Sequence, residues 1–306
     1  MKKYIALVLV LLVIIISIFF FFPTHLVAKI LNQTASVFFI DSITSKDLRE
    51  KYDNKKPIKI LVVPGHDQTS YGTIDGNVRE LDLNLELGRY LAERLKRNDK
   101  FEVILAQTED GFRPELAEYF EQEKGLIWQF KEQKAAIMDA LIGEGKINRK
   151  VVVDHISASN DTALKLYGLN HWANENKIDL VIHIHFNDYP GRRQDSIPKY
   201  AGYALYLPEQ QYSNSKASWD IGRDIAKSLA TEFAPSNHPQ ESAVLIPDQE
   251  LIAIGSFNTL DGASVLVEYG YIYEPTYAPA TPAVRSENLK RLAALTAYGV
   301  TNFFRD

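Results

Sequence analysis

From residue 58 to the C-terminus, short apolar runs alternate with segments whose apolar residues recur at helical spacing. The apolar runs have the length of strands and end at glycine, proline or polar residues. The predicted strands cover residues 58–63, 101–108, 178–187, 202–208 and 262–271, and the predicted helices cover residues 80–98, 160–176, 218–233 and 286–304. This alternation predicts an α/β fold with a mostly parallel central sheet flanked by helices.

Residues 112–150 interrupt the alternation with two more helical patterns. Their apolar positions are Leu126, Ile127, Trp128, Phe130, Ile137, Met138, Leu141 and Ile142. A connection this long is uncommon in a compact domain unless it has structure of its own, so we predict a helical insert. So many apolar side chains need a surface to bury against. The simplest expectation is that the insert extends the core or docks beside it.

The first 23 residues have the composition of a membrane anchor. Lys2 and Lys3 precede a run from Tyr4 to Phe22 without a charge, close to the roughly 20 residues that a helix needs to cross a bilayer. A cleaved signal peptide, leaving a secreted protein, is the alternative, but no clear small-x-small cleavage site follows. We expect the lysines to stay cytoplasmic and the rest of the chain to be extracytoplasmic. Residues 24–57 are then a linker, and residues 58–306 the folded domain.

Composition narrows the range of functions. The 306 residues are 46% hydrophobic and 24% charged, which is ordinary for a globular protein. A net charge of −5 argues against a nucleic-acid partner, because phosphate binding favours a basic excess. The chain has no cysteine, so disulfides, thiolate metal sites and cysteine nucleophiles are excluded. Any metal ion must be bound by His, Asp or Glu.

Candidate metal ligands occur where predicted strands end. His66 follows the first strand, Glu80 opens the next helix, and Glu268 lies near the end of the last strand. His183 and His185 lie two residues apart on one strand and therefore share a face. Two histidines and a carboxylate with an open fourth position can hold a catalytic zinc, and a further carboxylate can act as general base. Each residue also has an ordinary alternative role, such as a polar sheet edge or a helix-dipole partner, so both interpretations stay open.

Four motifs follow one another in an order known from one enzyme family. They are "VVPGH" at residues 62–66, "ELDLNL" at 80–85, "HIHFN" at 183–187 and "VLVEYGY" at 265–271. In these motifs the chain resembles the zinc-dependent N-acetylmuramoyl-L-alanine amidases, also called type 3 cell-wall amidases. The resemblance extends from about residue 58 to the C-terminus, apart from the insert.

The resemblance implies roles for individual residues. It implies that His66, Glu80 and His185 bind Zn²⁺ and that Glu268 is the catalytic base. Asn84, Asn187 and His183 are expected to contact substrate or support the ligands. The implied reaction is hydrolysis of the amide bond between N-acetylmuramic acid and L-alanine in peptidoglycan, in cell-wall remodelling or daughter-cell separation. Residues 58–306 would be the catalytic domain, attached to the membrane by the N-terminal helix.

The sequence also departs from the family pattern. Val63 stands where the family usually has aspartate, Asp67 and Gln68 replace two glycines, and His183 replaces a serine. An arginine that commonly follows the second core strand is missing. The three ligands and the base are unaffected, so these changes concern substrate preference more than chemistry. Two alternatives are a zinc peptidase or amidohydrolase that acts on another extracytoplasmic amide, and a non-catalytic wall-binding regulator.

The insert suggests a second, regulatory interpretation. In some division-associated amidases of the family a helical insertion covers the zinc until an activator displaces it, and residues 112–150 look similar in kind. Glu118, Glu121, Glu123 and Glu132 could then offer a carboxylate to the open zinc position. On this hypothesis, an activator protein would act on the insert.

Overall fold

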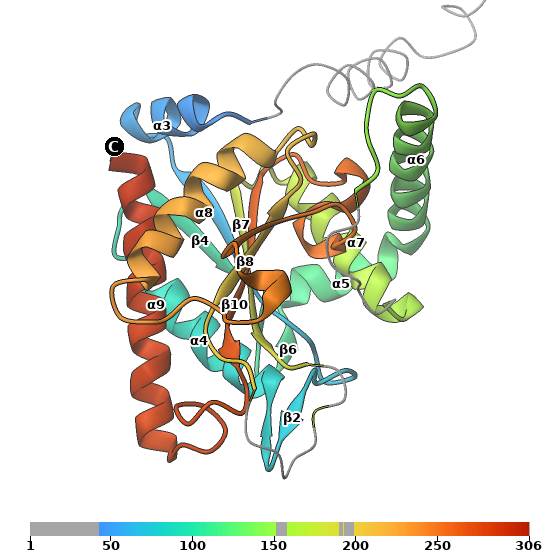
Figure 1. Ribbon diagram of the computed structural model, residues 1–306. Helices are drawn as coiled ribbons and strands as arrows, with labels where there is room; N and C mark the ends of the chain where they lie inside the picture. The colour runs from blue at the N-terminus through green and yellow to red at the C-terminus, as the bar shows by residue number, and fades with distance from the viewer. Residues whose placement is uncertain (1–42, 151–157, 190–191, 193–198, 306) are drawn as a thin grey trace, which may run out of the picture. The chain divides into compact units, whose positions relative to one another are not determined.

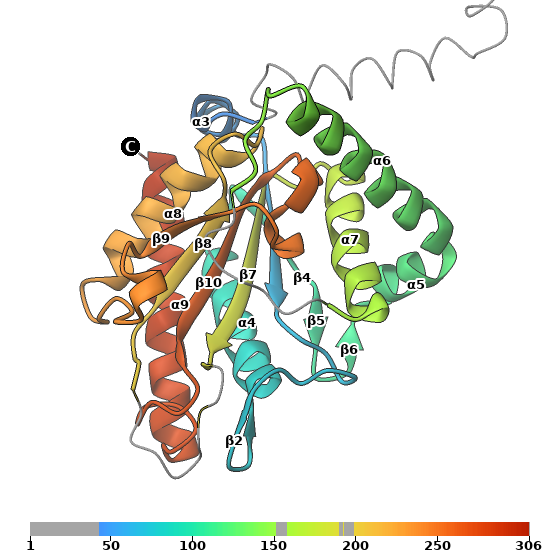
Figure 2. The same cartoon turned by 45° about the vertical axis from the view of Figure 1, so that its right-hand side comes forward.

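The computed structural model describes residues 43–150, 158–189, 192 and 199–305, and its centre is a six-stranded sheet (Figures 1 and 2). The strand order is β4-β1-β7-β10-β8-β9. The strands are β1 Ile58–Pro64, β4 Phe101–Leu105, β7 Leu180–Asn187, β8 Ala204–Pro208, β9 Leu245–Asp248 and β10 Ala263–Tyr271. β4, β1, β7 and β10 run parallel, β8 runs antiparallel to β10, and β9 is parallel to β8. The predicted α/β fold with a mostly parallel sheet is confirmed.

Helices cover both faces of this sheet. They are α3 Ser45–Asp53, α4 Glu80–Leu95, α5 Pro114–Gln122, α6 Lys124–Gly143, α7 Asn160–Glu175, α8 Ser215–Leu229 and α9 Pro282–Arg305. Two short hairpins, β2 Ile74–Asp75 with β3 Val78–Arg79 and β5 Gln107–Thr108 with β6 Gly111–Phe112, lie outside the main sheet. The 3₁₀ turns η1 Pro239–Glu241, η2 Ile252–Ile254 and η3 Ser256–Asn258 connect the last strands.

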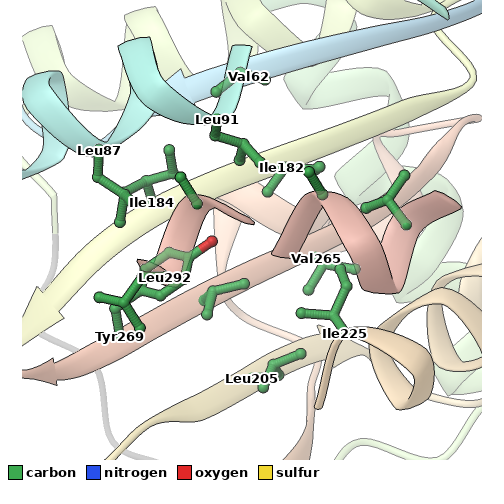
Figure 3. Close-up of a cluster of buried hydrophobic side chains, with 14 of the residues drawn as sticks. Val62, Leu87, Leu91, Ile182, Ile184, Leu205, Ile225, Val265, Tyr269 and Leu292 are labelled. Carbon is green, nitrogen blue, oxygen red and sulfur yellow. The ribbon is translucent and has the colours of Figure 1, made fainter. Parts of the chain in front are cut away.

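The larger core lies between the sheet and α4, α8 and α9. Alternate residues of the strands, such as Ile182 and Ile184 of β7 and Val265 of β10, point to this face (Figure 3). They meet Leu87 of α4 and Leu292 of α9, which are fully buried. Close packing of these side chains fixes the strands relative to one another.

The helical insert packs on the opposite face, against α7. Leu116 and Phe120 of α5 and Ile127 of α6 join Leu164 and other buried residues in a second core. Gly168 in the middle of α7 makes this close contact possible, because a Cβ atom there would lie 2.7 Å from the Phe120 ring. The insert therefore extends the core, as the simpler expectation held. In Figure 2, α6 runs from α5 towards the upper edge of the sheet, away from the carboxyl ends of β1, β7 and β10.

The linker predicted for residues 24–57 needs a correction in its last part. Residues 45–53 form α3, which begins with a capping box between Thr44 and Asp47. Leu48 and Tyr52 of α3 are buried in the larger core, so this helix belongs to the folded domain. Two buried positions in a highly charged segment are too weak a pattern to predict that this segment docks on the domain.

The predicted membrane anchor, residues 1–23, lies outside the described residues. Within residues 43–305, apart from the three undescribed internal stretches, no helix combines the length and apolar character required to span a bilayer. The anchor therefore stays a prediction from the sequence.

The insert buries one lysine, and its replacement tests how much this burial costs in stability. Lys134 of α6 is only 6% exposed, and its amine lies 5.8 Å from the centre of the Phe130 ring. Burial lowers the pKa of Lys134, an effect that Asp261 partly opposes. Because burial of a charge costs free energy, Lys134→Met should increase the free energy of unfolding by about 1–2 kcal/mol at pH 7.

This gain should shrink as the pH rises towards the ordinary lysine value, since the folded protein then loses the Lys134 proton before the unfolded chain does. Urea unfolding at pH 7 and pH 10 measures the effect, with the exposed Lys124→Met as the matched control. A loss of stability in Lys134→Met at pH 7 would show that the contacts of the amine outweigh its burial.

Candidate metal centre

The carboxyl edge of the parallel strands brings the predicted site residues together. His66 follows β1, and His185 lies near the C-terminal end of the neighbouring strand β7. In the parallel register between β7 and β10, Glu268 is paired with His185. The three segments are far apart in the sequence, and strand pairing places their side chains at one edge.

Glu80 joins the two histidines. Its Oε2 atom lies 3.0 Å from Nε2 of His66, and its Oε1 atom lies 3.0 Å from Nδ1 of His185. One ligand atom from each of the three residues lies within 4.8 Å of the others, and within the described part of the chain no other residue joins this group. The three predicted ligands therefore form one cluster, and the carboxylates of Glu118, Glu121, Glu123 and Glu132 are not part of it.

The spacing of the cluster fits a metal ion. Ligand atoms bound to a tetrahedral zinc at about 2.0–2.1 Å lie about 3.4 Å from one another, close to the 3.0 Å between Glu80 and each histidine. Two imidazoles and one carboxylate leave one tetrahedral position free. Small residues surround the cluster: a Cβ atom on Gly65 would lie 2.2 Å from the His185 ring, and one on Gly72 would lie 2.3 Å from Oε2 of Glu80. Only glycine lets the backbone come this close to the ligands.

The electrostatics of the cluster favour the forms that bind a metal. Burial raises the pKa of Glu80. The hydrogen bonds and charges of His185 and His66 lower it by more than this, so the net pKa lies below its usual range. Burial lowers the pKa of His185 more than Glu80 raises it, which keeps this imidazole neutral. For His66 burial also lowers the pKa, but Glu80 and Asp67 together raise it above the ordinary value. A bound cation would replace the His66 proton as the positive charge beside Glu80, since metal ligands bind in their deprotonated forms.

Glu80 is also held by the protein backbone. It is 4% exposed, and its two oxygens accept hydrogen bonds from the amides of Phe186 (3.2 Å) and Thr73 (3.0 Å). As the first residue of α4 it lies at the positive end of the helix dipole. These donors compensate for the burial of the carboxylate and fix its two oxygens toward the histidines.

Glu268 provides a second carboxylate beside the cluster. It shares a strand face with Leu266, opposite the core face of Val265 and Val267, and so lies on the same side as His185. Its Oε2 atom is buried and has no hydrogen-bond partner among the described residues. Burial, followed by the nearby charges of Glu80 and Glu241, raises the pKa of Glu268 well above its usual value. A carboxyl group with a raised pKa next to a metal-type cluster is typical of a general acid or base.

Comparison with known protein families agrees with this geometry. Residues 60–302 match the family model described as N-acetylmuramoyl-L-alanine amidase. The chain belongs to this amidase family. A comparison with curated proteins gave no match.

Several amidases of known structure share the fold. The N-acetylmuramoyl-L-alanine amidase of Clostridium difficile 630 aligns with a TM-score of 0.52 and 15% identity, over 82% of this chain and 98% of that one. The CwlD amidase of Clostridioides difficile, solved in complex with the GerS lipoprotein, gives 0.51 and 13%, over 81% and 98%. The catalytic domain of CwlV from Bacillus (Paenibacillus) polymyxa var. colistinus gives 0.50 and 17%, over 81% and 98%. At these identities the likeness is one of fold.

The remaining residues predicted for the amidase site lie in three different surroundings. Asn84 is fully buried and donates to the carbonyl of Gly65 (3.1 Å), so it supports the loop of His66. Asn187 donates to Glu241 (2.6 Å). His183 is buried beside Leu266 and lies outside the ligand cluster. Burial and the neighbouring His185 lower the pKa of His183 to about 3, so its ring is neutral.

Glu241 is a site neighbour that the sequence did not indicate. Its carboxylate, 3% exposed, accepts hydrogen bonds from Asn187, Tyr206, Ser236 and Tyr271. These donors come from four separate segments, and Glu241 itself lies in η1 between a helix and an edge strand. No local pattern marks such a residue, because its partners are defined only by the tertiary fold. The network holds Asn187 and Tyr206 in place, and the charge of Glu241 helps to raise the pKa of Glu268.

The cluster leads to a direct test of the ligand assignment. Single substitutions His66→Ala, Glu80→Ala and His185→Ala should each weaken Zn²⁺ binding by on the order of 100-fold or more, because each removes a direct ligand. Glu268→Ala and His183→Ala should bind Zn²⁺ as the unchanged protein does. Chelator competition measures the affinities. The assignment is wrong if His183→Ala loses zinc while His185→Ala keeps it.

Proposed function

We propose that this amidase is a zinc-dependent N-acetylmuramoyl-L-alanine amidase that hydrolyses the bond between N-acetylmuramic acid and L-alanine in peptidoglycan. The observation that supports it most directly is the cluster of His66, Glu80 and His185 with the carboxylate of Glu268 beside it. Membership of the amidase family supports the reaction class, and the donor set supports the metal.

Zinc fits the cluster better than the harder cations. Two imidazole nitrogens and one carboxylate oxygen suit Zn²⁺, whereas Mg²⁺ and Ca²⁺ favour all-oxygen sites. When bound, Zn²⁺ supplies a Lewis acid that polarises the scissile carbonyl and makes water more acidic. His66, Glu80 and His185 would hold the ion and leave its fourth tetrahedral position open.

Glu268 has the position of the proton carrier. Its free oxygen belongs to a residue paired with His185 in the sheet, so a water molecule between the two side chains could give its proton to this carboxylate. The same carboxyl group can then protonate the amine of L-alanine as the amide bond breaks. Its raised pKa suits the first step, since a carboxylate with a higher pKa is the better proton acceptor.

The N-terminal sequence supports a location at the wall. We propose that residues 1–23 anchor the protein in the cell membrane, with the catalytic domain on the extracytoplasmic side, where peptidoglycan lies. Such an enzyme would act in cell-wall remodelling or daughter-cell separation. One structure of similar fold is that of an amidase bound to a lipoprotein. For this chain, an activator acting on residues 112–150 stays a prediction.

Digestion of purified peptidoglycan tests the proposed reaction. The zinc-loaded full-length protein should release stem peptides with a free L-alanine amino terminus and leave N-acetylmuramic acid intact in the glycan. Glu268→Gln should lower the rate by about 10²–10⁴-fold without changing zinc content, because only the proton carrier is lost. The exposed Glu93→Gln is the matched control and should keep full activity.

Mass spectrometry of the released fragments identifies the bond. New ends within the peptide or the glycan would show that the enzyme cleaves another amide bond or a glycosidic bond, and would contradict the proposed reaction. A zinc-loaded protein that binds peptidoglycan without releasing any fragment would support a non-catalytic regulator instead.

A further inference from the structure

The loop that presents His66 is held by side-chain amides from outside it. Gln107 donates from Nε2 to the carbonyl oxygens of Pro64 (2.6 Å) and His66 (2.6 Å). Asn84 donates to the carbonyl between them, that of Gly65. Three consecutive carbonyls are therefore satisfied by two buried amides, and Gln107 serves two of them.

The loop needs such support because of its backbone conformation. His66 has a φ of 68°, in the left-handed region that residues other than glycine rarely adopt. The amide of Gly65 still donates to Ile184 of β7 (2.8 Å), whereas the carbonyls of Pro64, Gly65 and His66 accept from side-chain amides. Buried carbonyls without a donor would favour a different loop conformation. The strained conformation persists because its surroundings define it.

The backbone contacts around Gln107 and the burial of its side chain fix its position. It lies in β5, directly after Ala106, whose amide donates to the carbonyl of Val62 in β1 (2.9 Å). Its side chain is 2% exposed and so is held in one place. A second contact fixes the next residue of the loop, because Lys165 of α7 pairs with Asp67 (2.7 Å). The loop of His66 is thus held from β5 on one side and from α7 on the other.

We propose that Gln107 is a positioning residue for the metal ligand His66. By bridging the carbonyls of Pro64 and His66, its amide fixes the loop so that the His66 ring is directed at Glu80 before any metal arrives. This inference rests on the proposed function, since it assigns His66 to the zinc site. Residues behind a ligand commonly change metal affinity by about 10–100-fold when they are replaced.

A purely structural role is the competing explanation. On that view Gln107 only satisfies two carbonyls, and its loss would lower stability without a specific effect on zinc. Gln249 offers a matched comparison. It is 8% exposed and donates to the carbonyl of Asn148 (2.9 Å) and to Glu209 (3.3 Å). It follows β9, whose C-terminal end lies at the opposite edge of the sheet from His66.

The experiment compares Gln107→Met with Gln249→Met in the full-length protein. Methionine keeps the length of the side chain and removes the amide. Chelator competition measures the Zn²⁺ dissociation constant, and thermal unfolding of the metal-free protein measures stability. Gln107→Met should weaken Zn²⁺ binding by about 10–100-fold. Gln249→Met should lower the melting temperature of the metal-free protein and leave the dissociation constant unchanged.

An unchanged zinc affinity in Gln107→Met, or an equal loss in Gln249→Met, would overturn the proposal. If Gln107→Met does not fold, Gln107→Asn decides: its amide is one methylene shorter and cannot span both carbonyls, so zinc affinity should again fall. Failure of the proposed function gives a different result, because the unchanged protein would then bind no zinc.

Discussion

The site depends on one buried carboxylate that two histidines share. Glu80 opens a helix, accepts two backbone amides and lies 3.0 Å from a nitrogen of His66 and of His185. Its burial is tolerated only because these donors and the helix dipole compensate for the lost hydration. Through it, the loop after β1, the start of α4 and the end of β7 are fixed relative to one another. A change in any of these segments would move the ligands.

The two faces of the sheet have different roles: one forms the larger core, and the other carries the site residues. The face towards α4, α8 and α9 is a continuous apolar core that fixes the register of β1, β7 and β10. The other face is covered by the insert and α7 over part of its area, and at its carboxyl edge it presents His185 and Glu268. Parallel pairing puts these two residues side by side, although 83 positions separate them, from residue 185 to residue 268. The strand register that the apolar core fixes therefore brings His185 and Glu268 together.

Local patterns in the sequence predicted much of this arrangement. The strand that ends at Pro-Gly-His, the helix that opens on Glu80 and the alternation around His185 all follow from apolar spacing that a single segment contains. Their assembly at one edge followed from the rule that parallel strands share their carboxyl ends. The catalytic and metal-binding roles of these residues still rest on the family resemblance and the geometry together.

Other features could not be predicted, since they depend on contacts between distant segments. Glu241 and Gln107 look like ordinary polar residues in the sequence, and only the fold shows which buried groups they meet. The short helix α3 has two apolar contacts in a charged segment, so its docking is a tertiary effect. In the insert, the apolar positions predicted helices correctly, but their docking partner is set by Gly168, a residue that helix propensity would disfavour.

X-ray absorption spectroscopy of the zinc-loaded full-length protein tests the central claim most directly. It reports which atoms surround the metal. The account predicts one zinc bound by two imidazole nitrogens and one carboxylate oxygen at about 2.0–2.2 Å, with one further oxygen from water. A zinc bound by three imidazoles, which would include His183, or a zinc without a carboxylate ligand would contradict it.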